Sequence, residues 1–298
     1  MRVLLIGGSG QLGHALAAAF ADSNELLATA YLHAQPGEVV LDISDAAATK
    51  ALMKSWRPEV VLVSGAMCHV DRCEREPERC RRVNVDAPAL VADYARQHGG
   101  RVVFFSTDHV FDGEQSSYNE SDAVHPLSVY AQSKLEAENV IRETIPAQHL
   151  IIRTGWVYGP DLQRRNFILR LVDRLQAGEK VAVPVDQWGR PTYTDDLAGV
   201  TRILVGRGEI GTFHATGPEL VDRMSLARRV CDRFELDINQ VLPRPTAALG
   251  QVAQRSLRVL LDCSKLHGTG VPAFRGITSG LEALAAWSES VRPCQEAS

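Results

Sequence analysis

The first 155 or so residues alternate short apolar runs with helix-like patterns, and this alternation limits the fold more than any other feature of the chain. Apolar runs without polar alternation are typical of strands covered on both faces. Strands that alternate with helices form parallel sheets, so the pattern predicts an α/β fold with a doubly wound parallel sheet. The expected strands are 3–7, 26–31, 60–64, 101–106 and 150–154, and the expected helices are 11–20, 46–56, 75–97 and 133–144.

A second, smaller part of the chain is expected beyond residue 155, where the pattern becomes irregular and richer in Arg, Pro and Gly. Residues 195–205 and 212–215 are expected to return to the sheet as a helix and a strand. Further helices are expected near 167–176 and 278–288. The predicted division is a dinucleotide-binding domain, residues 1–155 plus about 192–216, and a smaller C-terminal substrate-binding lobe, residues 156–191 and 217–298.

A glycine-rich turn follows the first expected strand and opens the first expected helix. Its Gly-x-Gly-x-x-Gly spacing allows a tight turn close to a pyrophosphate, whose charge the helix N-terminus then holds. This setting predicts a Rossmann-type fold with NADP or NAD as cofactor. The expected cofactor contacts in the turn are Gly7, Gly10, Gln11, Leu12 and Gly13.

The end of the second expected strand bears on the choice between NADP and NAD. An acidic residue about 20 residues beyond the glycine turn usually binds the unphosphorylated ribose. Here the strand ends Ala30-Tyr31-Leu32-His33. Without a carboxylate to repel a 2′-phosphate, NADP is favoured. Without an arginine to bind that phosphate, NAD stays open.

Composition and charge exclude several kinds of partner. Lys plus Arg number 32 and Asp plus Glu 36, a formal net charge of -4, and 6% of the residues are aromatic. With neither a basic tract nor many aromatic residues, no nucleic acid partner is expected. There is no signal-peptide pattern and no apolar run near the length of about 18 residues that marks a membrane span, so a cytoplasmic protein without membrane contact is expected.

The cysteines are predicted to be reduced thiols rather than disulfides or metal ligands. Cys73 and Cys80 are seven residues apart in an expected helix, which places both on one buried stripe. No C-x-x-C pair is present to clamp a tetrahedral ion, so no structural zinc is expected. The six cysteines are Cys68, Cys73, Cys80, Cys231, Cys263 and Cys294.

Tyr130 and Lys134 are four residues apart at the start of an expected helix, so the phenol and the ammonium share one face. A close ammonium favours phenolate and lowers the phenol pKa from about 10 towards neutral pH, which suits proton transfer. Upstream, strand 101–106 runs into Ser106-Thr107. These small hydroxyls lie at the carboxyl end of a strand, where ligands bind in open α/β sheets.

Over residues 1–215 the order of motifs resembles extended short-chain dehydrogenase/reductases of the dTDP-4-dehydrorhamnose reductase type. The resemblance implies that Tyr130 is the proton donor, that Lys134 orients it and holds the nicotinamide ribose, and that Thr107 hydrogen-bonds the substrate carbonyl. The motifs are the glycine turn, Ser-Thr-Asp-x-Val-Phe-Asp-Gly at 106–113, Pro-x-x-x-Tyr-x-x-x-Lys at 126–134, Arg-Thr-Gly-Trp-Val-Tyr-Gly at 153–159, Asn-Phe at 166–167 and Asp-Gln-Trp-Gly-Arg-Pro-Thr at 186–192.

The same resemblance implies further binding residues. Asp42 and Ile43 match the pair that lies along the adenine, and Asn84 matches a helix asparagine near the active site. The residues expected to contact the nucleotide-linked sugar are Thr107, Asp108, Trp156, Asn166, Asp186 and Gln187.

Some positions depart from the family pattern. Residues 63–66 read Val-Ser-Gly-Ala where Asn-Ala-Ala-Ala is usual, and His109 replaces a tyrosine. We expect His109 to line the substrate pocket or to be solvated rather than to act as a general base. Ala15 stands where some members carry an acidic residue for a metal at the dimer contact, so no bound metal is expected. A homodimer stays open.

The leading hypothesis is therefore an NAD(P)-dependent oxidoreductase that uses NADPH to reduce the 4-keto group of a nucleotide-linked 6-deoxy sugar, as in dTDP-rhamnose biosynthesis. A 4,6-dehydratase is disfavoured because Asp108 is followed by His109 and not by Glu. A sugar-nucleotide epimerase with tightly held NAD is one alternative. The stretch 254–266 also resembles the regulatory beta subunit of methionine adenosyltransferase, so an NADP-binding regulatory subunit is another.

Overall fold

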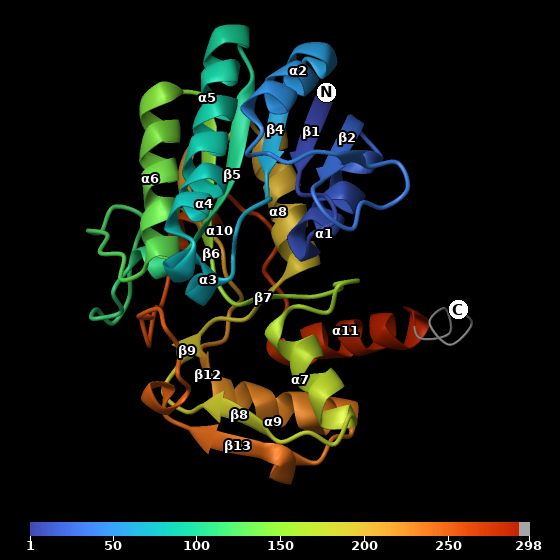
Figure 1. Ribbon diagram of the computed structural model, residues 1–298, viewed down its shortest axis with the longest axis vertical. Coiled ribbons are helices and arrows are strands. Elements are labelled where there is room, and N and C mark those ends of the chain that lie inside the picture. The colour runs from blue at the N-terminus through green and yellow to red at the C-terminus, as the bar shows by residue number, and fades with distance from the viewer. Residues whose placement is uncertain (292–298) are drawn as a thin grey trace.

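The computed structural model describes residues 1–291, in which seven parallel strands form the central sheet in the order β11-β6-β5-β4-β1-β2-β3 (Figure 1). The chain steps to one side of β1 and then to the other, which is the doubly wound arrangement and confirms the predicted Rossmann-type fold. The strands are β1 (Arg2–Ile6), β2 (Glu25–Ala30), β3 (Val39–Val40), β4 (Val60–Val63), β5 (Arg101–Thr107), β6 (His149–Thr154) and β11 (Gly211–His214).

Helices cover both faces of the sheet, because alternate strand residues point to opposite sides. In β1, Val3 and Leu5 join a buried core with α1 and α8, whereas Leu4 and Ile6 join a core with α2, α5 and α6. The uninterrupted apolar runs therefore fill two cores at once. The helices are α1 (Gln11–Ala21), α2 (Ala46–Trp56), α5 (Ala87–His98), α6 (Val129–Thr144) and α8 (Thr194–Gly206).

The helix expected near 75–97 is present from Pro77, but the continuous helix expected through residues 71–85, which contains Cys73 and Cys80, is wrong because it breaks at Glu76. The chain forms α3 (Val70–Arg75) and α4 (Pro77–Arg81), then a π-helical turn (Arg82–Asp86) that leads into α5. Pro77 has no N–H to continue α3 and disfavours helical backbone at the residue before it. Glu76 accordingly leaves the helical region, at φ -128 and ψ 57.

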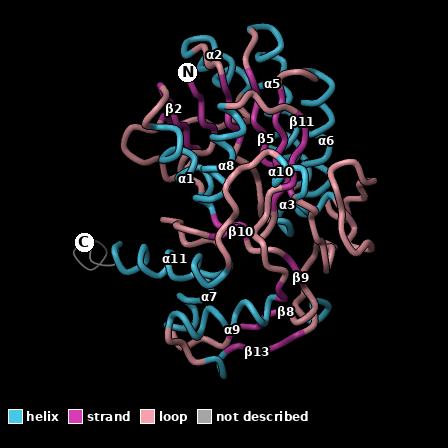
Figure 2. Tube along the Cα trace, turned by 180° about the vertical axis from the view of Figure 1, so that it is seen from behind, coloured by secondary structure: helices cyan, strands magenta, loops and turns pink. Residues whose placement is uncertain are grey.

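A second layer of structure lies beyond the carboxyl ends of the strands, at the bottom of Figure 1 and again in the reverse view of Figure 2. Its own apolar core joins α7, α9, α11 and β8. The helices there are α7 (Phe167–Gln176), α9 (Arg223–Phe234) and α11 (Ile277–Val291), and the strands β8 (Val181–Pro184) and β13 (Val241–Arg244) pair in parallel. Short elements between the layers are β7 (Val157–Tyr158), β9 (Trp188–Gly189), β10 (Thr192–Tyr193) and β12 (Val221–Asp222). The short helix α10 (Ser264–Gly268) packs against β11 of the central sheet.

Part of the C-terminal region returns to the sheet. Leu266, Val271 and Phe274 are buried in the same core as Phe213 of β11. This stretch was expected in the substrate lobe, but its apolar side chains cover the sheet edge instead. The remaining domain boundaries stay a prediction. Every helix within residues 1–291 is too short or too polar to cross a membrane.

Candidate active site

The glycine turn joins β1 to α1 at the carboxyl end of the sheet. Gly7 has φ +92, and a Cβ there would lie 2.5 Å from Gly65 N. A Cβ at Gly13 would overlap the Gly7 carbonyl oxygen. Gly10 is the N-cap of α1, and no described side chain caps this helix or places a carboxylate in its first turn. The positive end of the α1 dipole is therefore available to phosphate.

Three buried polar atoms near the strand ends have no hydrogen-bond partner among residues 1–291: Gln11 Nε2 at the start of α1, Ser106 Oγ in β5 and Thr154 Oγ1 at the end of β6. Buried polar atoms are normally paired. The phosphate, ribose and amide groups of a dinucleotide would supply such partners. These residues therefore fit a bound NADP or NAD, while Leu12 packs against the core beneath the turn.

The residues expected at the adenine lie beyond β3. Asp42 Oδ1 accepts hydrogen bonds from Ser44 N (2.9 Å) and Ser44 Oγ (2.7 Å). Ile43 is buried in the core beneath the sheet. The Asp42 carboxylate is thus half-buried, and the Ile43 side chain belongs to the core. Contact of these two residues with adenine stays a prediction.

Glu38 was not among the expected site residues, yet its carboxylate lies against the glycine turn. A Cβ on Gly8 would run into Glu38 Oε1, and Glu38 Oε2 accepts a hydrogen bond from Gln35 N (2.7 Å). A carboxylate from the loop before β3 therefore lies beside the turn. Glu38 lies outside the strand–turn–helix pattern, so the sequence analysis did not identify it.

The structure brings Thr107 and Tyr130 together. Thr107 is the last residue of β5, and its Oγ1 donates to Asp108 Oδ1 (3.2 Å) and accepts from His109 N (3.2 Å). Tyr130 lies in the first turn of α6, and the Thr107 side chain is near enough to its phenol to lower the pKa of that phenol. The expected proton donor and the expected carbonyl ligand therefore meet at the carboxyl end of β5, and His109 is half-buried beside them.

Burial governs the protonation of the Tyr130–Lys134 pair. Burial raises the pKa of Tyr130 well above its usual value, and nearby Cys68 adds to this effect. Burial lowers the pKa of Lys134 to about 8, and its Nζ lies 3.9 Å from the centre of the Phe104 ring. The prediction that the ammonium lowers the phenol pKa is therefore wrong for the chain without cofactor. Tyr130 holds its proton, as a proton donor must.

The lowered pKa of Lys134 predicts a pH-dependent stability. The unfolded chain, with a lysine pKa of about 10.4, binds the proton more tightly than the folded chain, whose value is about 8. The free energy of unfolding should therefore rise between about pH 8 and pH 10. Lys134→Met should remove this rise and should be more stable than the original chain at neutral pH. Urea unfolding across this pH range is the measurement, and parallel profiles for the two chains would contradict the prediction.

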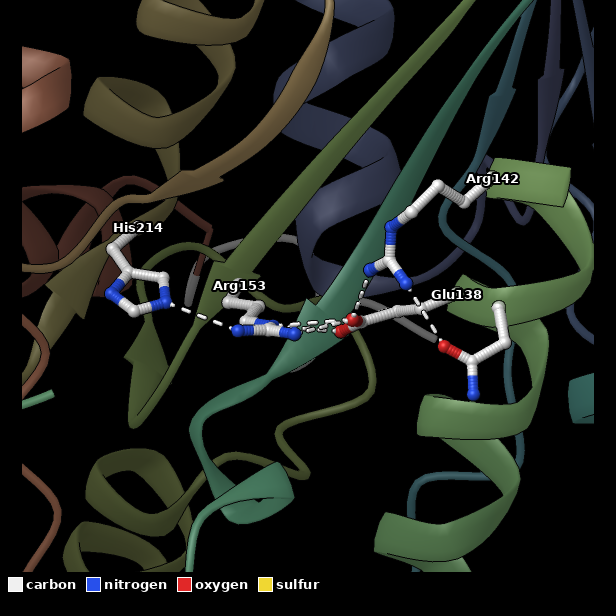
Figure 3. A network of polar contacts seen from close by, with 5 residues as sticks. Glu138, Arg142, Arg153 and His214 are labelled. Carbon is white, nitrogen blue, oxygen red and sulfur yellow. Dashed lines mark hydrogen bonds and ion pairs between the residues drawn. The ribbon is translucent and has the colours of Figure 1, made fainter. Parts of the chain in front are cut away.

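Glu138, one turn beyond Lys134, ties α6 to β6 (Figure 3). Its side chain is fully buried and accepts from Arg153 Nη2 (2.7 Å) and Nε (3.0 Å), and from Arg142 Nη2 (3.2 Å). Arg153 Nη1 lies 3.5 Å from His214 Nε2. Burial lowers the pKa of His214 to about 3, with a further decrease from Arg153, so this imidazole is neutral. The network fixes the helix that carries Tyr130 and Lys134.

Two of the residues expected around the sugar, Trp156 and Asn166, make contacts within the fold. Trp156 has φ +49, and a Cβ at Gly189 would collide with its ring. Asn166 caps α7, accepting from Leu169 N (2.9 Å) and donating to Gly159 O (3.2 Å). The amide of Asn166 is thus already engaged in the fold, and its role with substrate stays a prediction.

Gln187 and Asp186 both contact Thr246. Gln187 Nε2 donates to Thr246 Oγ1 (3.2 Å) and to Gln251 Oε1 (3.4 Å). Asp186 accepts from Thr246 N (3.0 Å). The two side chains hold the loop that follows β13, and direct contact with a substrate stays a prediction for both.

Arg223 is a second residue that the sequence did not single out. Its guanidinium carbon lies 3.4 Å from the centre of the Trp156 ring and 4.6 Å from that of Phe167. Burial lowers its pKa to about 9, nearby Asp108 raises it and nearby Arg255 lowers it. Arg255 pairs with Asp71 (3.1 Å), and its buried Nη1 has no partner among the described residues. Two guanidinium groups therefore share one region with Trp156 and Asp108.

No group of three or more His, Cys, Asp or Glu side chains within residues 1–291 is arranged to hold a metal ion. Ala15, the position at which some relatives were expected to carry an acidic ligand, is buried in the core against the sheet.

Comparison with known sequences agrees with this geometry. The family model described as RmlD substrate binding domain matches residues 1–288. The chain is 32% identical over 285 residues to a probable dTDP-4,6-dihydroxy-2-methyloxan-3-one 4-ketoreductase of Streptomyces antibioticus, covering 94% of this chain and 93% of that protein. It is 31% identical over 278 residues to methionine adenosyltransferase 2 subunit beta of Danio rerio, covering 91% and 85%.

A solved structure of similar architecture is the dTDP-4-dehydrorhamnose reductase of Bacillus anthracis in complex with NADP. It matches with a TM-score of 0.87 at 25% identity, covering 96% of this chain and 98% of that chain. The family model spans nearly the whole chain. The chain therefore belongs to the RmlD substrate binding domain family, within the extended short-chain dehydrogenase/reductases of the dTDP-4-dehydrorhamnose reductase type.

Proposed function

We propose that this chain is an NADPH-dependent reductase of the 4-keto group of a nucleotide-linked 6-deoxy sugar. The observation that carries the proposal is that Thr107, at the end of β5, and Tyr130, at the start of α6, lie near each other, in a fold that also presents the glycine turn at the strand ends. The relative from Streptomyces antibioticus is named a 4-ketoreductase, and the Bacillus anthracis reductase is in complex with NADP.

Each residue of the set has a distinct task. When bound, a reduced nicotinamide supplies a hydride to the keto carbon. The Thr107 hydroxyl donates a hydrogen bond to the substrate carbonyl oxygen, and the protonated Tyr130 phenol gives its proton to that oxygen as negative charge develops. Lys134 holds the nicotinamide ribose and orients Tyr130.

The substrate's charge fits the region around Arg223 and Asp108. A nucleotide-linked sugar carries a diphosphate, and guanidinium groups bind phosphate through charge-assisted hydrogen bonds. Arg223 and Arg255 lie near Asp108 and Trp156. We assign the diphosphate to these two guanidinium groups and the sugar to Thr107, Asp108 and Trp156.

The direct test is NADPH consumption with dTDP-4-dehydrorhamnose and with other nucleotide-linked ketosugars. We expect turnover with at least one of them and faster turnover with NADPH than with NADH. NADPH binding without turnover of any ketosugar would contradict the proposal.

A regulatory subunit is the second candidate, because the Danio rerio relative is a subunit of methionine adenosyltransferase. A regulatory subunit has no need of a phenol placed near Thr107. Stable co-purification with a methionine adenosyltransferase catalytic subunit, together with no ketosugar turnover, would favour this candidate over the reductase.

Glu38 provides a test of cofactor preference. Its carboxylate lies against Gly8 on the glycine turn, where it would repel a 2′-phosphate. We expect Glu38→Gln to tighten NADPH binding several-fold, about 1 kcal/mol, and to change NADH binding little. Fluorescence titration measures the dissociation constants of NADPH and NADH, and their ratio gives the cofactor preference. The matched control is Glu25→Gln at the opposite end of β2, which should leave this ratio unchanged.

The five described cysteines are free thiols, which suits a reducing compartment. We place the protein in the cytoplasm on this basis. Cys294 lies outside the described residues.

A further inference from the structure

A segment of the second layer lies against the glycine turn. Residues 159–166 connect β7 to α7, and in Figure 1 this segment passes below α1. The Gln163 Nε2 amide donates to Ser9 O in the turn (2.8 Å), although the two residues are 154 positions apart in the chain. The function proposed above gives no task to this segment, which we call the strap.

The strap is held in shape by its own polar groups and by the second layer. The buried Asp161 carboxylate accepts hydrogen bonds from Gln163 N (3.0 Å) and Arg165 N (2.7 Å). Arg164 has φ +49, and its Nε donates to Asp173 Oδ1 in α7 (2.8 Å). The strap is therefore a preformed piece of the second layer, and the Gln163 side chain fastens it to the glycine turn.

The strap and the turn enclose a cavity that is too small for a phosphate group. Its walls include Gly10 and Gln11 at the start of α1, Gln35 from the loop after β2, and Asp161 and Leu162 from the strap. The space inside is about 10 Å³, roughly enough for one water molecule. A pyrophosphate binds at the N-terminus of the first helix of this fold. Its way in and out past these residues is therefore closed.

The hydrogen bond of Gln163 leaves the phosphate-binding groups of the turn free. Ser9 contributes a carbonyl oxygen to this hydrogen bond, whereas backbone N–H groups at the start of a helix bind phosphate. No described side chain caps α1. The buried Gln11 Nε2 likewise has no partner among residues 1–291. The Gln163–Ser9 hydrogen bond is therefore compatible with a loaded glycine turn as well as with an unloaded one.

We propose that the strap is a gate over the NADP site and that Gln163 is the residue that keeps it shut. The inference rests on the cofactor of the proposed function and needs no sugar substrate. The strap opens when the diphosphate enters or leaves, and it closes again afterwards. Because the Gln163–Ser9 hydrogen bond is made in both the free and the loaded protein, it slows binding and release by the same factor. Its contribution cancels from the dissociation constant, since a contact made equally in two states does not shift the equilibrium between them.

Stopped-flow fluorescence with NADPH alone measures the association and dissociation rate constants. Gln163→Met keeps the length of the side chain but has no N–H group to donate. We expect both rate constants to rise about three- to tenfold, the effect of one lost hydrogen bond, with the dissociation constant unchanged. Gln163→Glu, whose ionised carboxylate also donates no hydrogen bond, should give the same result.

Gln97→Met is the matched control. Gln97 Nε2 also donates to a side chain, Asp93 Oδ2 (2.7 Å), but this pair lies on α5, away from the glycine turn. Both rate constants for NADPH should equal those of the unaltered chain. Urea unfolding checks that each variant is folded.

The proposal is overturned if Gln163→Met leaves both rate constants unchanged, or if only one of them rises. Faster release alone would mean that Gln163 contacts the cofactor directly, and faster binding alone would mean that the closed strap competes with the cofactor. A chain that does not bind NADPH would overturn both the gate and the reductase. A chain that binds NADPH with the expected rates but turns over no ketosugar would contradict the reductase alone.

Discussion

Tyr130→Phe is expected to lower kcat for ketosugar reduction by about 10²- to 10⁴-fold, the usual contribution of a positioned proton donor. The phenol lies near Thr107, and burial keeps it protonated. Phenylalanine keeps the ring but has no proton to give to the carbonyl oxygen. Steady-state NADPH oxidation measures kcat, and fluorescence titration should show NADPH binding close to that of the original chain.

The matched control is Tyr94→Phe. The Tyr94 hydroxyl also donates a partly buried hydrogen bond, to Met53 O (2.8 Å). Tyr94 lies in α5, away from the strand ends. Its loss should cost stability and leave kcat about unchanged. If Tyr130→Phe and Tyr94→Phe had similar kcat values, Tyr130 would not be the proton donor.

Glu138→Gln is expected to lower the free energy of unfolding by about 3–5 kcal/mol, because it leaves a buried guanidinium without its countercharge. Glu138 is fully buried and Arg153 is almost so, with 4% of its side chain exposed. Glutamine preserves the shape of the side chain but not the negative charge. Urea unfolding followed by circular dichroism measures the difference.

Glu136→Gln is the control for this effect, because Glu136 lies on the same helix and also pairs with an arginine. Its partner is Arg81 (2.7 Å), and the two side chains are 44% and 54% exposed. An exposed pair of this kind contributes less than about 1 kcal/mol. A similar loss of stability in both variants would show that burial does not set the strength of the Glu138–Arg153 pair.

The central sheet could be predicted from sequence because each strand is apolar on both faces. β4, for example, is the run Val-Val-Leu-Val with all four residues buried. A short, β-branched run of this kind is typical of a strand covered on both faces. The glycine turn was predicted for a similar reason, since Gly7 and Gly13 occupy positions that a Cβ would block.

The interruption at Pro77 was also present in the sequence, but the apolar spacing of Cys73 and Cys80 concealed it. Both cysteines are buried as that spacing implied, although they lie in different helices. Helix periodicity reports which side chains face the core. It does not report whether the backbone between them is continuous.

Glu38 and Arg223 could not be predicted, because each reaches the site from a segment without regular spacing. Glu38 comes from the loop between β2 and β3, and Arg223 from the first residue of α9 in the second layer. Their places depend on tertiary packing between distant parts of the chain. The pKa of Tyr130 was wrongly predicted for a related reason, since the degree of burial is a property of the fold and not of the Tyr-x-x-x-Lys spacing.

Because residues 266–274 pack against the sheet, the core around β11 can be completed only late in synthesis. Phe213 of β11 is covered by Leu266, Val271 and Phe274, which leave the ribosome after nearly all of the chain. Until then the growing chain displays an apolar sheet edge, the kind of surface on which partly made proteins aggregate. The nascent polypeptide would depend on chaperones longest at that edge, and a gene cut after residue 216 would encode a protein that never covers it.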